Sequence, residues 1–517
     1  MKTILFLLFI FYTVQFAQDD YKKWLENQKK KLNNFIKEDD KRFVEFLKKD
    51  WEKFQLFQGL KPDKTPKPPV MPVYKPPEEL PYDPELKPTE LEKIKKIPDV
   101  PPGLEKKAKE KSDEIEQTEN QESELKPVEP AVQEIDPVEI EYLVDPEKNN
   151  NHFDVDFYGT SKTMMTETNF QIRSPGKIDK EYIGDFWELM STKNYKDILI
   201  QTQNYNDKLN LNDWGYCMLL NKIGEKIYPS SPDLKHLLIW FLLNKSGYKA
   251  RVGIIENKVY VFFPSENKIY GVPYFLTNES QEKLYVIDFD NLESSLSGSL
   301  FTYNEDYPGA DKILDMNIYR APNIEEDFKT TELSFTYKDI KYKVPVEYNK
   351  SLIRFYKDYP YSNLEVYFNS AISNETKNSM ISSLKYIIED KPDPVAVNML
   401  LRFVQTSFGY KTDQPNFGRE KPLFREETIH YPYSDCEDRS ILFSYLVKNI
   451  LGLSVIGVDY PGHVATAVKF NLDVPGDYIT YKGEKYIICD PTYTNAYIGM
   501  SMQKYKNTKP EKIIEIN

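Results

Sequence analysis

A proline-rich segment between residues 61 and 102 separates the parts of this 517-residue chain that can form a packed core from a part that cannot. It holds 13 of the 35 prolines, including the runs Lys-Pro-Pro-Val-Met-Pro and Lys-Pro-Pro. Proline lacks a backbone donor and favours extended geometry, so the segment is expected to be a semi-rigid spacer. Residues 103–150 are dominated by Glu, Lys, Gln and Pro, a composition typical of disorder. We therefore assign residues 59–150 to a Pro-rich and charged disordered linker.

The segment at the N-terminus, residues 1–18, has the layout of a secretory signal peptide. Lys2 precedes an uncharged run from Ile4 to Phe16, and Ala17 supplies a small residue for cleavage. The run is short for a membrane-crossing helix, so no membrane span is expected after signal cleavage. The protein is therefore expected to be exported, either to a periplasm or into the medium.

Residues 19–58 are predicted to form an amphipathic helix, because their apolar side chains recur at spacings of three, four and seven. Such a stripe needs cover, from the body of the protein or in a short coiled coil. Self-association through residues 20–58 is the alternative. Because the Pro-rich span cannot join a sheet, the sequence also predicts that residues 19–150 can be removed without unfolding the body.

Charge and cysteine content exclude several classes of protein. A net charge of −13 argues against a nucleic-acid partner, which calls for a basic face. Three cysteines are too few for a disulfide framework or a four-thiolate zinc site, and no metal-binding motif is present. We therefore expect no cofactor and no metal. Cys217 and Cys489 are interpreted as core thiols.

A helix that is apolar on nearly every face begins near Ser434 and ends before Gly452. Ser434 as N-cap and Glu437 three residues later form a capping box, and Gly452 suits the C-terminal cap. The helix is expected to be buried, with Cys436 at its second position. Helix-start amides and a histidinium partner favour the thiolate, whereas the flanking carboxylates oppose it. We expect the helix-start amides and the histidinium to outweigh the carboxylates and to hold the pKa of Cys436 below about 8.5.

Three strand-like segments follow this helix, at residues 455–458, 463–470 and 485–490. The second begins with His463 and the third ends with Asp490, just before a proline that cannot continue a ladder. If these two strands pair antiparallel around residues 476–477, His463 lies opposite Asp490. A cysteine nucleophile, a histidine base and an orienting aspartate are the components of acyl-transfer chemistry.

The order Cys436, His463, Asp490, with Asp-Pro-Thr closing the last strand, resembles the transglutaminase-like superfamily. The likeness covers roughly residues 350–500, with Tyr410 and Asp413 in the segment before the cysteine. It implies an α+β fold with papain-like architecture, in which a central helix packs on an antiparallel sheet. It also implies that the three residues act as a catalytic triad.

Two parts of the implied site are left open by the sequence. Val464-Ala465 stands where the family frequently has Ala-Trp, so the wall beside the base is not identified. The residue that completes the oxyanion hole is not identified either. Gln405 and Gln414 are candidates, although a glutamine in a helix or loop is more often simply solvated.

Residues 150–325 carry a weaker copy of the same layout, with an apolar helix from Ser231 to Gly247 followed by strand-like segments at residues 250–255, 259–263 and 268–272. Aligned on glycines and prolines, Ser231 or Pro232 replaces the cysteine, Val259 the histidine and Val272 the aspartate. The sequence therefore predicts tandem domains: a degenerate transglutaminase-like domain at residues 151–325 and a catalytic one at residues 326–517.

The function that these features favour is an exported, cysteine-dependent acyl-transfer enzyme. A peptidase or amidase acting on peptide or protein amides is the leading interpretation, with Cys436, His463 and Asp490 as the triad. A protein-crosslinking transglutaminase is an alternative, in which a lysine amine replaces water. A non-catalytic surface scaffold with a vestigial triad is the alternative from another class.

Overall fold

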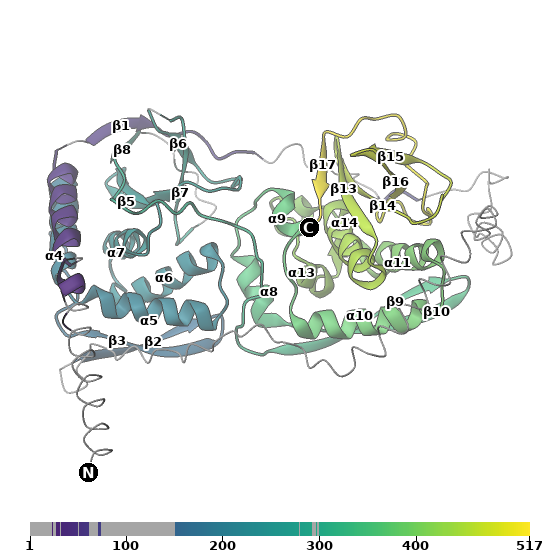
Figure 1. Ribbon diagram of the computed structural model, residues 1–517, viewed down its shortest axis with the longest axis horizontal. Coiled ribbons are helices and arrows are strands. Elements are labelled where there is room, and N and C mark those ends of the chain that lie inside the picture. Colours follow the sequence, from purple (N-terminus) through teal and green to yellow (C-terminus); the bar gives the residue numbers. More distant parts are fainter. Residues whose placement is uncertain are drawn as a thin grey trace, which may run out of the picture. The chain divides into compact units, whose positions relative to one another are not determined.

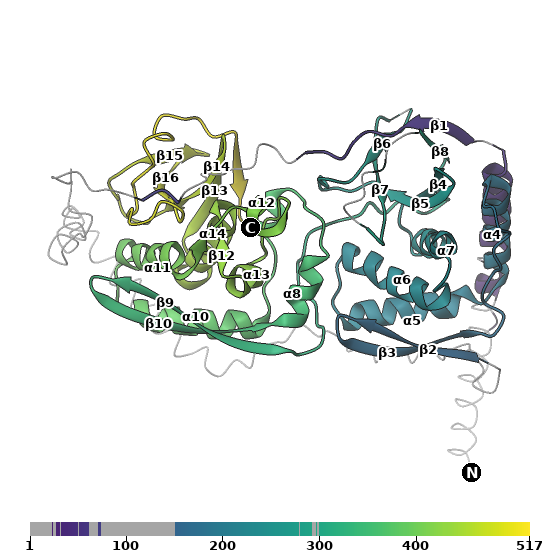
Figure 2. The ribbon, with the colours of Figure 1, turned by 180° about the vertical axis from the view of Figure 1, so that it is seen from behind.

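The computed structural model describes residues 23, 27–31, 33–49, 51–61, 71–73, 150–278, 280–291, 296 and 299–517. All of these residues belong to one structural unit. The predicted signal peptide and most of the predicted linker lie outside the described residues. The described part is mixed α+β, with helices packed on antiparallel sheets (Figures 1 and 2).

The first lobe, defined as residues 150–325, is built on a sheet in the order β1-β8-β4-β5-β7-β6. Helix α7 packs on this sheet, α6 packs on α7, and the β2–β3 hairpin covers α5 and α6. The strands are β1 (Trp51–Gln55), β2 (Asn150–Phe157), β3 (Thr160–Glu167), β4 (Arg251–Ile255), β5 (Lys258–Phe263), β6 (Tyr274–Leu276), β7 (Lys283–Ile287) and β8 (Ser299–Tyr303). The helices are α4 (Lys180–Thr192), α5 (Tyr195–Lys208), α6 (Asp213–Ile227) and α7 (Pro232–Lys245).

The second lobe, residues 326–517, has a sheet in the order β15-β16-β14-β13-β17, against which α14 packs. Helices α11 and α13 lie on α14, and the β9–β10 hairpin covers α10 and α11. The strands are β9 (Phe328–Tyr337), β10 (Ile340–Asn349), β11 (Gly409–Tyr410), β12 (Tyr433–Ser434), β13 (Ser454–Tyr460), β14 (His463–Lys469), β15 (Tyr478–Tyr481), β16 (Glu484–Cys489) and β17 (Lys512–Glu515). The helices are α8 (Lys350–Lys357), α9 (Leu364–Phe368), α10 (Asn374–Ile388), α11 (Asp393–Ser407), α12 (Asp413–Phe417), α13 (Arg425–His430) and α14 (Cys436–Leu446), which continues as a π-helical turn, Val447–Leu451.

The two sheets have the same strand order. Read from one edge, β8-β4-β5-β7-β6 matches β17-β13-β14-β16-β15, and only β1 has no counterpart. Helix α7 precedes β4 and β5 in the chain, and helix α14 precedes β13 and β14. Each of these two helices is buried on all sides. Each lobe also opens with a two-stranded hairpin, β2–β3 or β9–β10. The two lobes therefore share a strand order and the placement of a buried helix.

The N-terminal end of α14 lies one residue later than the sequence predicted. Asp435, not Ser434, is the N-cap, and Cys436 is the first helical residue rather than the second. The reason is that Asp438, rather than Glu437, accepts a hydrogen bond from the N-cap amide, at 3.2 Å. At the other end, Gly452 adopts a positive φ of 68° and ends the π-helical turn, as predicted.

The strand pairing differs from the prediction by two residues. Thr466 of β14 pairs with Cys489 of β16, so Asp490 lies just beyond the ladder instead of opposite His463. The connection between the two strands is also longer than expected, because residues 476–477 lead into an additional strand, β15, and the hairpin turns at Lys482–Gly483. A shift of two residues keeps every side chain on its predicted face of the sheet.

The described N-terminal residues dock on the first lobe. The predicted helix ends at Leu47, and Trp51–Gln55 forms β1, which pairs antiparallel with β8. Phe43 is buried and contacts the ring of Trp187, with centroids 4.8 Å apart. The prediction of one helix over residues 19–58 was therefore wrong. Of the two alternatives for its apolar stripe, the structure shows docking on the body, which argues against removing residues 19–150 without cost.

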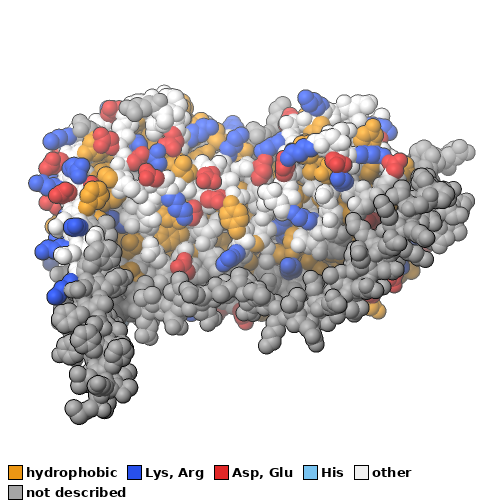
Figure 3. Space-filling view, viewed as in Figure 1, with side chains coloured by type: hydrophobic (Ala, Val, Ile, Leu, Met, Phe, Trp, Pro, Cys, Tyr) orange, Lys and Arg blue, Asp and Glu red, His pale blue; other side chains and the backbone are white. Residues whose placement is uncertain are grey.

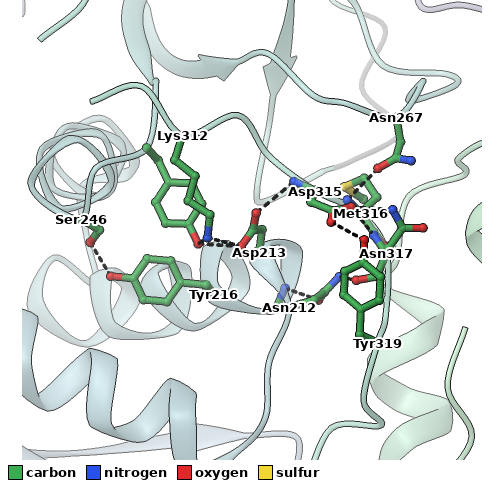
Figure 4. Close-up of polar contacts among 12 residues, drawn as sticks. Asn212, Asp213, Tyr216, Ser246, Asn267, Lys312, Asp315, Met316, Asn317 and Tyr319 are labelled. Carbon is green, nitrogen blue, oxygen red and sulfur yellow. Dashed lines mark hydrogen bonds and ion pairs between the residues drawn. The ribbon is translucent and has the colours of Figure 1, made fainter. Parts of the chain in front are cut away.

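Polar contacts join α6 to the chain that leads into the second lobe (Figure 4). Asp213 accepts hydrogen bonds from the Lys312 ammonium at 2.7 Å and from the Asp315 amide at 3.0 Å. The amide of Asn212 donates to the Tyr359 hydroxyl at 2.8 Å. These contacts fix the start of α6 against residues 312–315 and against Tyr359, just after α8.

The described surface carries charges of both signs. On the face shown in Figure 3, the lysine and arginine side chains are interspersed with aspartate and glutamate. None of the helices in the described part of the chain combines the length and the apolar character needed to cross a bilayer.

Candidate functional site

The first turn of α14 holds Cys436 against the start of β14. The helix packs on β14, and the Ser440 hydroxyl, one turn after Cys436, donates to the Val464 carbonyl at 3.1 Å. The Cys436 sulfur itself is hydrogen-bonded to the backbone of Val464. Since Val464 directly follows His463, these contacts bring the cysteine beside the histidine.

The Cys436 side chain is fully buried and is surrounded by carboxylates. Its thiol donates to Glu437 Oε2 at 3.1 Å. Burial raises the pKa of this thiol well above its ordinary value, and the carboxylates of Glu437 and Asp435 raise it further. The expectation of a lowered pKa was therefore wrong, because desolvation and the flanking acids outweigh the helix terminus. The structure holds Cys436 as a neutral thiol.

His463 and Asp490 meet as the sequence predicted, although the strand register differs. The distance from His463 Nε2 to Asp490 Oδ2 is 2.8 Å, and both side chains are buried. The other carboxylate oxygen, Oδ1, accepts from the amides of Thr492 and Tyr493 at 2.9 and 3.2 Å. Asp490 is thus fixed at both oxygens, and the Nδ1 atom of His463 has no hydrogen-bond partner among the described residues.

Tyr505 forms the wall beside His463 that the sequence left open. Its ring stacks on the imidazole with centroids 5.0 Å apart and planes inclined by 22°. Tyr460 also stacks on Tyr505, with centroids 5.1 Å apart, and the Tyr505 hydroxyl donates to the Gly462 carbonyl at 3.3 Å. Tyr505 lies 42 residues after His463 and outside any strand, which is why no local pattern revealed it.

Neither glutamine considered for the oxyanion hole lies in a position to serve it. The side-chain amide of Gln405 donates to the carbonyls of Asp490, Tyr493 and Ala496, at 3.2, 2.8 and 3.1 Å. Its role is to hold the loop that follows β16. The Gln414 amide donates to the Gly418 carbonyl within α12 and its cap.

Arg439 and a short piece of the predicted linker lie next to this loop. The Arg439 guanidinium donates to the carbonyls of Gln405, Phe408 and Gly409, at 3.1, 2.9 and 3.1 Å. It also contacts the Met71 sulfur at 3.7 Å. Close by, the Thr494 amide donates to the Pro72 carbonyl at 3.0 Å. Residues 71–73 therefore contact the second lobe at Arg439 and at Thr494.

Buried carboxylates beneath Cys436 form a cluster that the sequence analysis did not recognise. We call it the acid cluster; it comprises Asp413, Asp435, Glu437 and Asp438. Burial raises the pKa of Asp435 well above its ordinary value, and repulsion from the other three acids raises it further. The Asp-Cys-Glu-Asp run was the visible signal, but Asp413 comes from a separate helix, and only the tertiary fold brings it here.

The first lobe carries one counterpart of the triad. Pro232 is the first residue of α7, where α14 has Cys436, and Lys258 opens β5, where β14 has His463. The residue after β7 is Asp288, which corresponds to Asp490 because Val261 pairs with Ile287 as Thr466 pairs with Cys489.

The alignment of Val259 and Val272 with the histidine and the aspartate was therefore wrong. The alignment of Val259 relied on a glycine, and that of Val272 relied on a proline and on a strand predicted at residues 268–272, where the structure has only isolated bridges before β6. Asp288 Oδ1 accepts from the amides of Asp290 and Asn291, at 3.1 and 3.2 Å, in the manner of Asp490. The first lobe thus has a carboxylate at the position that matches Asp490, and it has Pro232 and Lys258 at the positions that match Cys436 and His463.

Comparison with protein-family models, with curated proteins and with solved structures finds no match for this chain.

Proposed function

We propose that this protein is a cysteine-dependent acyl-transfer enzyme with a transglutaminase-like fold in tandem, of which the second copy is catalytic. The observation that carries the proposal is the 2.8 Å contact between His463 and Asp490, together with a buried thiol on α14 that is hydrogen-bonded to the backbone of Val464, the residue after His463. A buried histidine bonded to a doubly anchored carboxylate is a costly arrangement for a merely structural role. The tandem fold is supported by the matching strand orders of the two lobes.

The chemistry begins with transfer of the Cys436 proton to His463 Nδ1 as the sulfur attacks a carbonyl carbon. Amides of the first turn of α14 are suitable donors for the resulting oxyanion. The imidazolium then gives its proton to the departing amine, and a thioester remains on Cys436. Water, deprotonated by His463, cleaves the thioester to a carboxylate and restores the thiol. Asp490 keeps the imidazole oriented and does not itself take the proton.

The raised pKa of the thiol shapes this mechanism. A neutral thiol hydrogen-bonded to Glu437 cannot attack until a base removes its proton. We therefore infer general-base activation by His463 during attack, in place of a thiolate–imidazolium pair that exists before substrate binds. We also propose that residues 1–18 direct export of the protein. Its substrates are then peptide or protein amides outside the cytoplasm.

Product analysis tests the proposal and separates its variants. The full chain is incubated with peptides that carry glutamine, with and without an added primary amine, and the products are weighed by mass spectrometry. We expect hydrolysed amides that are missing when Cys436→Ala replaces the native chain. Amine-linked products would instead favour a crosslinking transglutaminase. Identical products from Cys436→Ala, or no product from any peptide, would favour the scaffold alternative.

A further inference from the structure

One side chain of helix α7, the imidazole of His236, is buried with only one of its two nitrogens bonded. The residue is 3% exposed, and its Nδ1 atom lies 2.7 Å from the Val259 carbonyl oxygen. Because a carbonyl oxygen only accepts, Nδ1 carries the proton of this hydrogen bond. Burial lowers the pKa of the imidazole below its ordinary value, which favours the neutral ring. The other nitrogen, Nε2, then has a free lone pair and no hydrogen-bond partner among the described residues.

Two carboxylates lie beside this imidazole, on the loop that follows β7. A ring nitrogen of His236 and one oxygen each of Asp288 and Asp290 lie within 4.8 Å of one another. Since Nδ1 is bonded to the backbone, Nε2 is the nitrogen with a lone pair to offer to an ion at this place. A lone pair and carboxylate oxygens held this close repel one another unless a cation or a proton lies among them.

The contacts already made by the two carboxylates leave room for a further partner. Asp288 is half-buried, and its Oδ1 atom accepts from the amides of Asp290 and Asn291 at 3.1 and 3.2 Å. The described residues donate no hydrogen bond to its other oxygen, Oδ2. Asp290 is exposed, and one of its oxygens forms an ion pair with the buried ammonium of Lys235. Lys235 thus balances Asp290, whereas no cationic side chain in the described part of the chain pairs with Asp288.

The matching position of the second lobe shows what is particular to the first. His236 is the fifth residue of α7, and Ser440 is the fifth residue of α14. Their side chains bond to equivalent carbonyls, those of Val259 and Val464, each the second residue of its strand. The serine side chain ends at that bond, whereas the imidazole has a second polar atom beyond it. The first lobe therefore has an additional nitrogen next to the carboxylate that corresponds to Asp490.

We propose that His236, Asp288 and Asp290 bind a divalent transition-metal ion of the zinc type. An imidazole nitrogen with two carboxylate oxygens suits such an ion, whereas calcium and magnesium prefer oxygen ligands alone. The bond from Nδ1 to a backbone carbonyl is the support that metal-bound histidines usually have, since it orients the ring and makes Nε2 more basic. Asp290 also lines a cavity of ≈ 780 Å³, which provides a route for the ion and space for a fourth, exchangeable ligand.

This site is separate from the triad and does not depend on the proposed function. All three ligands belong to the first lobe, where Pro232 and Lys258 stand at the positions that match Cys436 and His463. A metal ion gives this lobe a binding role that requires neither a nucleophile nor a base. With three protein ligands, the ion keeps a position open toward the cavity, as in zinc sites that bind water or substrate and unlike closed structural ones.

Zinc binding is measured on the full chain with Cys436→Ala, because a thiol beside a histidine also binds zinc. The protein is stripped with EDTA, transferred to EDTA-free buffer and titrated with ZnCl₂ by calorimetry, with thermal unfolding as a second readout. Excess CaCl₂ is present throughout, so that clusters of oxygen ligands alone do not contribute. We expect zinc to bind and to raise the unfolding midpoint by a few degrees.

Asp288→Asn is the critical variant, because asparagine keeps the oxygen that accepts the two loop amides and loses the charge. It should bind zinc about tenfold more weakly or worse, with an unfolding midpoint before zinc addition close to that of Cys436→Ala alone. His236→Gln should weaken binding at least as much. The matched control is Asp490→Asn, the same change at the corresponding position of the second lobe, which should leave the zinc affinity unchanged.

The proposal is wrong if the Cys436→Ala chain binds no zinc, or if its zinc affinity is the same with Asp288→Asn added. Loss of binding in Asp490→Asn, with binding kept in Asp288→Asn, would place the ion at the triad and overturn the proposal as well. Should His236→Gln fail to fold, Asp288→Asn decides the question alone.

Discussion

The imidazole of His463 is fixed by two side chains that act in different ways. Asp490 sets its orientation through a hydrogen bond to Nε2, and Tyr505 confines the ring plane by stacking. Tyr505 is in turn held by Tyr460. Because the second constraint is made by an aromatic face, it depends on ring area and not on the tyrosine hydroxyl.

Replacing Tyr505 tests this constraint. An aromatic pair is worth about 0.5–1.5 kcal/mol, so Tyr505→Ala should lower turnover by up to about tenfold through a misplaced His463. Tyr505→Phe keeps the stacked face and should retain nearly full turnover. Rates for both variants are measured across pH, because a displaced imidazole also shifts the pH profile. Equal losses in the two variants would show that the hydroxyl, and not the stacking, is what matters.

Glu426 should make stability depend on pH. Its buried carboxyl accepts a hydrogen bond from the Ser373 amide at 2.7 Å, and burial raises its pKa from 4.5 to about 7. A raised acid pKa means that the folded chain holds the proton more tightly. Its stabilising contribution is thus complete below pH 4.5 and is lost as pH rises through 7. The loss amounts to about 3 kcal/mol. Urea unfolding at pH 5 and pH 8 should show a smaller difference in Glu426→Gln, and an unchanged difference would contradict the assignment.

At the scale of elements, the described N-terminal helix behaves as part of the first lobe. Its apolar side chains enter the aromatic core formed by α4 and α7, and β1 extends the first sheet at the β8 edge. The second sheet has no equivalent of β1. The helix and β1 together therefore distinguish the two copies of the fold.

Phe43→Ala tests this docking. Removing a buried aromatic side chain costs about 3–5 kcal/mol, so the free energy of unfolding of the full chain should fall by that amount. Phe35 lies on the same helix and is 60% exposed, which makes Phe35→Ala a matched control with an effect near zero. Chemical denaturation measures both. If the two variants unfold alike, the helix does not contribute to the core.

The sequence predicted the fold well where the pattern of apolar residues was long and regular. Helix α14 and strands β13 and β14 were expected because a wholly apolar helix and regular strands between Gly and Pro leave few alternatives. Strand β15 was missed, since it is only four residues long and none of its side chains is fully buried. Asp288 was missed because prolines were used to align the lobes. Tyr505 and Asp413 act through tertiary contacts, which no local period encodes.

Across the whole molecule, the account predicts that one of three equally buried thiols is chemically distinct. Cys217, Cys436 and Cys489 are all free, and none has exposed surface. Of the three, Cys436 is the one hydrogen-bonded to the backbone of the residue that follows a histidine, Val464. If burial alone set their reactivity, the three cysteines would react alike. A base beside one of them would make that cysteine react faster than the other two.

Site-resolved labelling of the native full chain with iodoacetamide at neutral pH measures this difference most directly. The account predicts that Cys436 is alkylated while Cys217 and Cys489 are not, and that His463→Ala slows labelling of Cys436 by about a hundredfold. The same variant should keep the native unfolding midpoint within a few degrees. If Cys436 is labelled no faster than the other two thiols, or equally fast with and without His463, then His463 does not activate the cysteine and the acyl-transfer proposal fails.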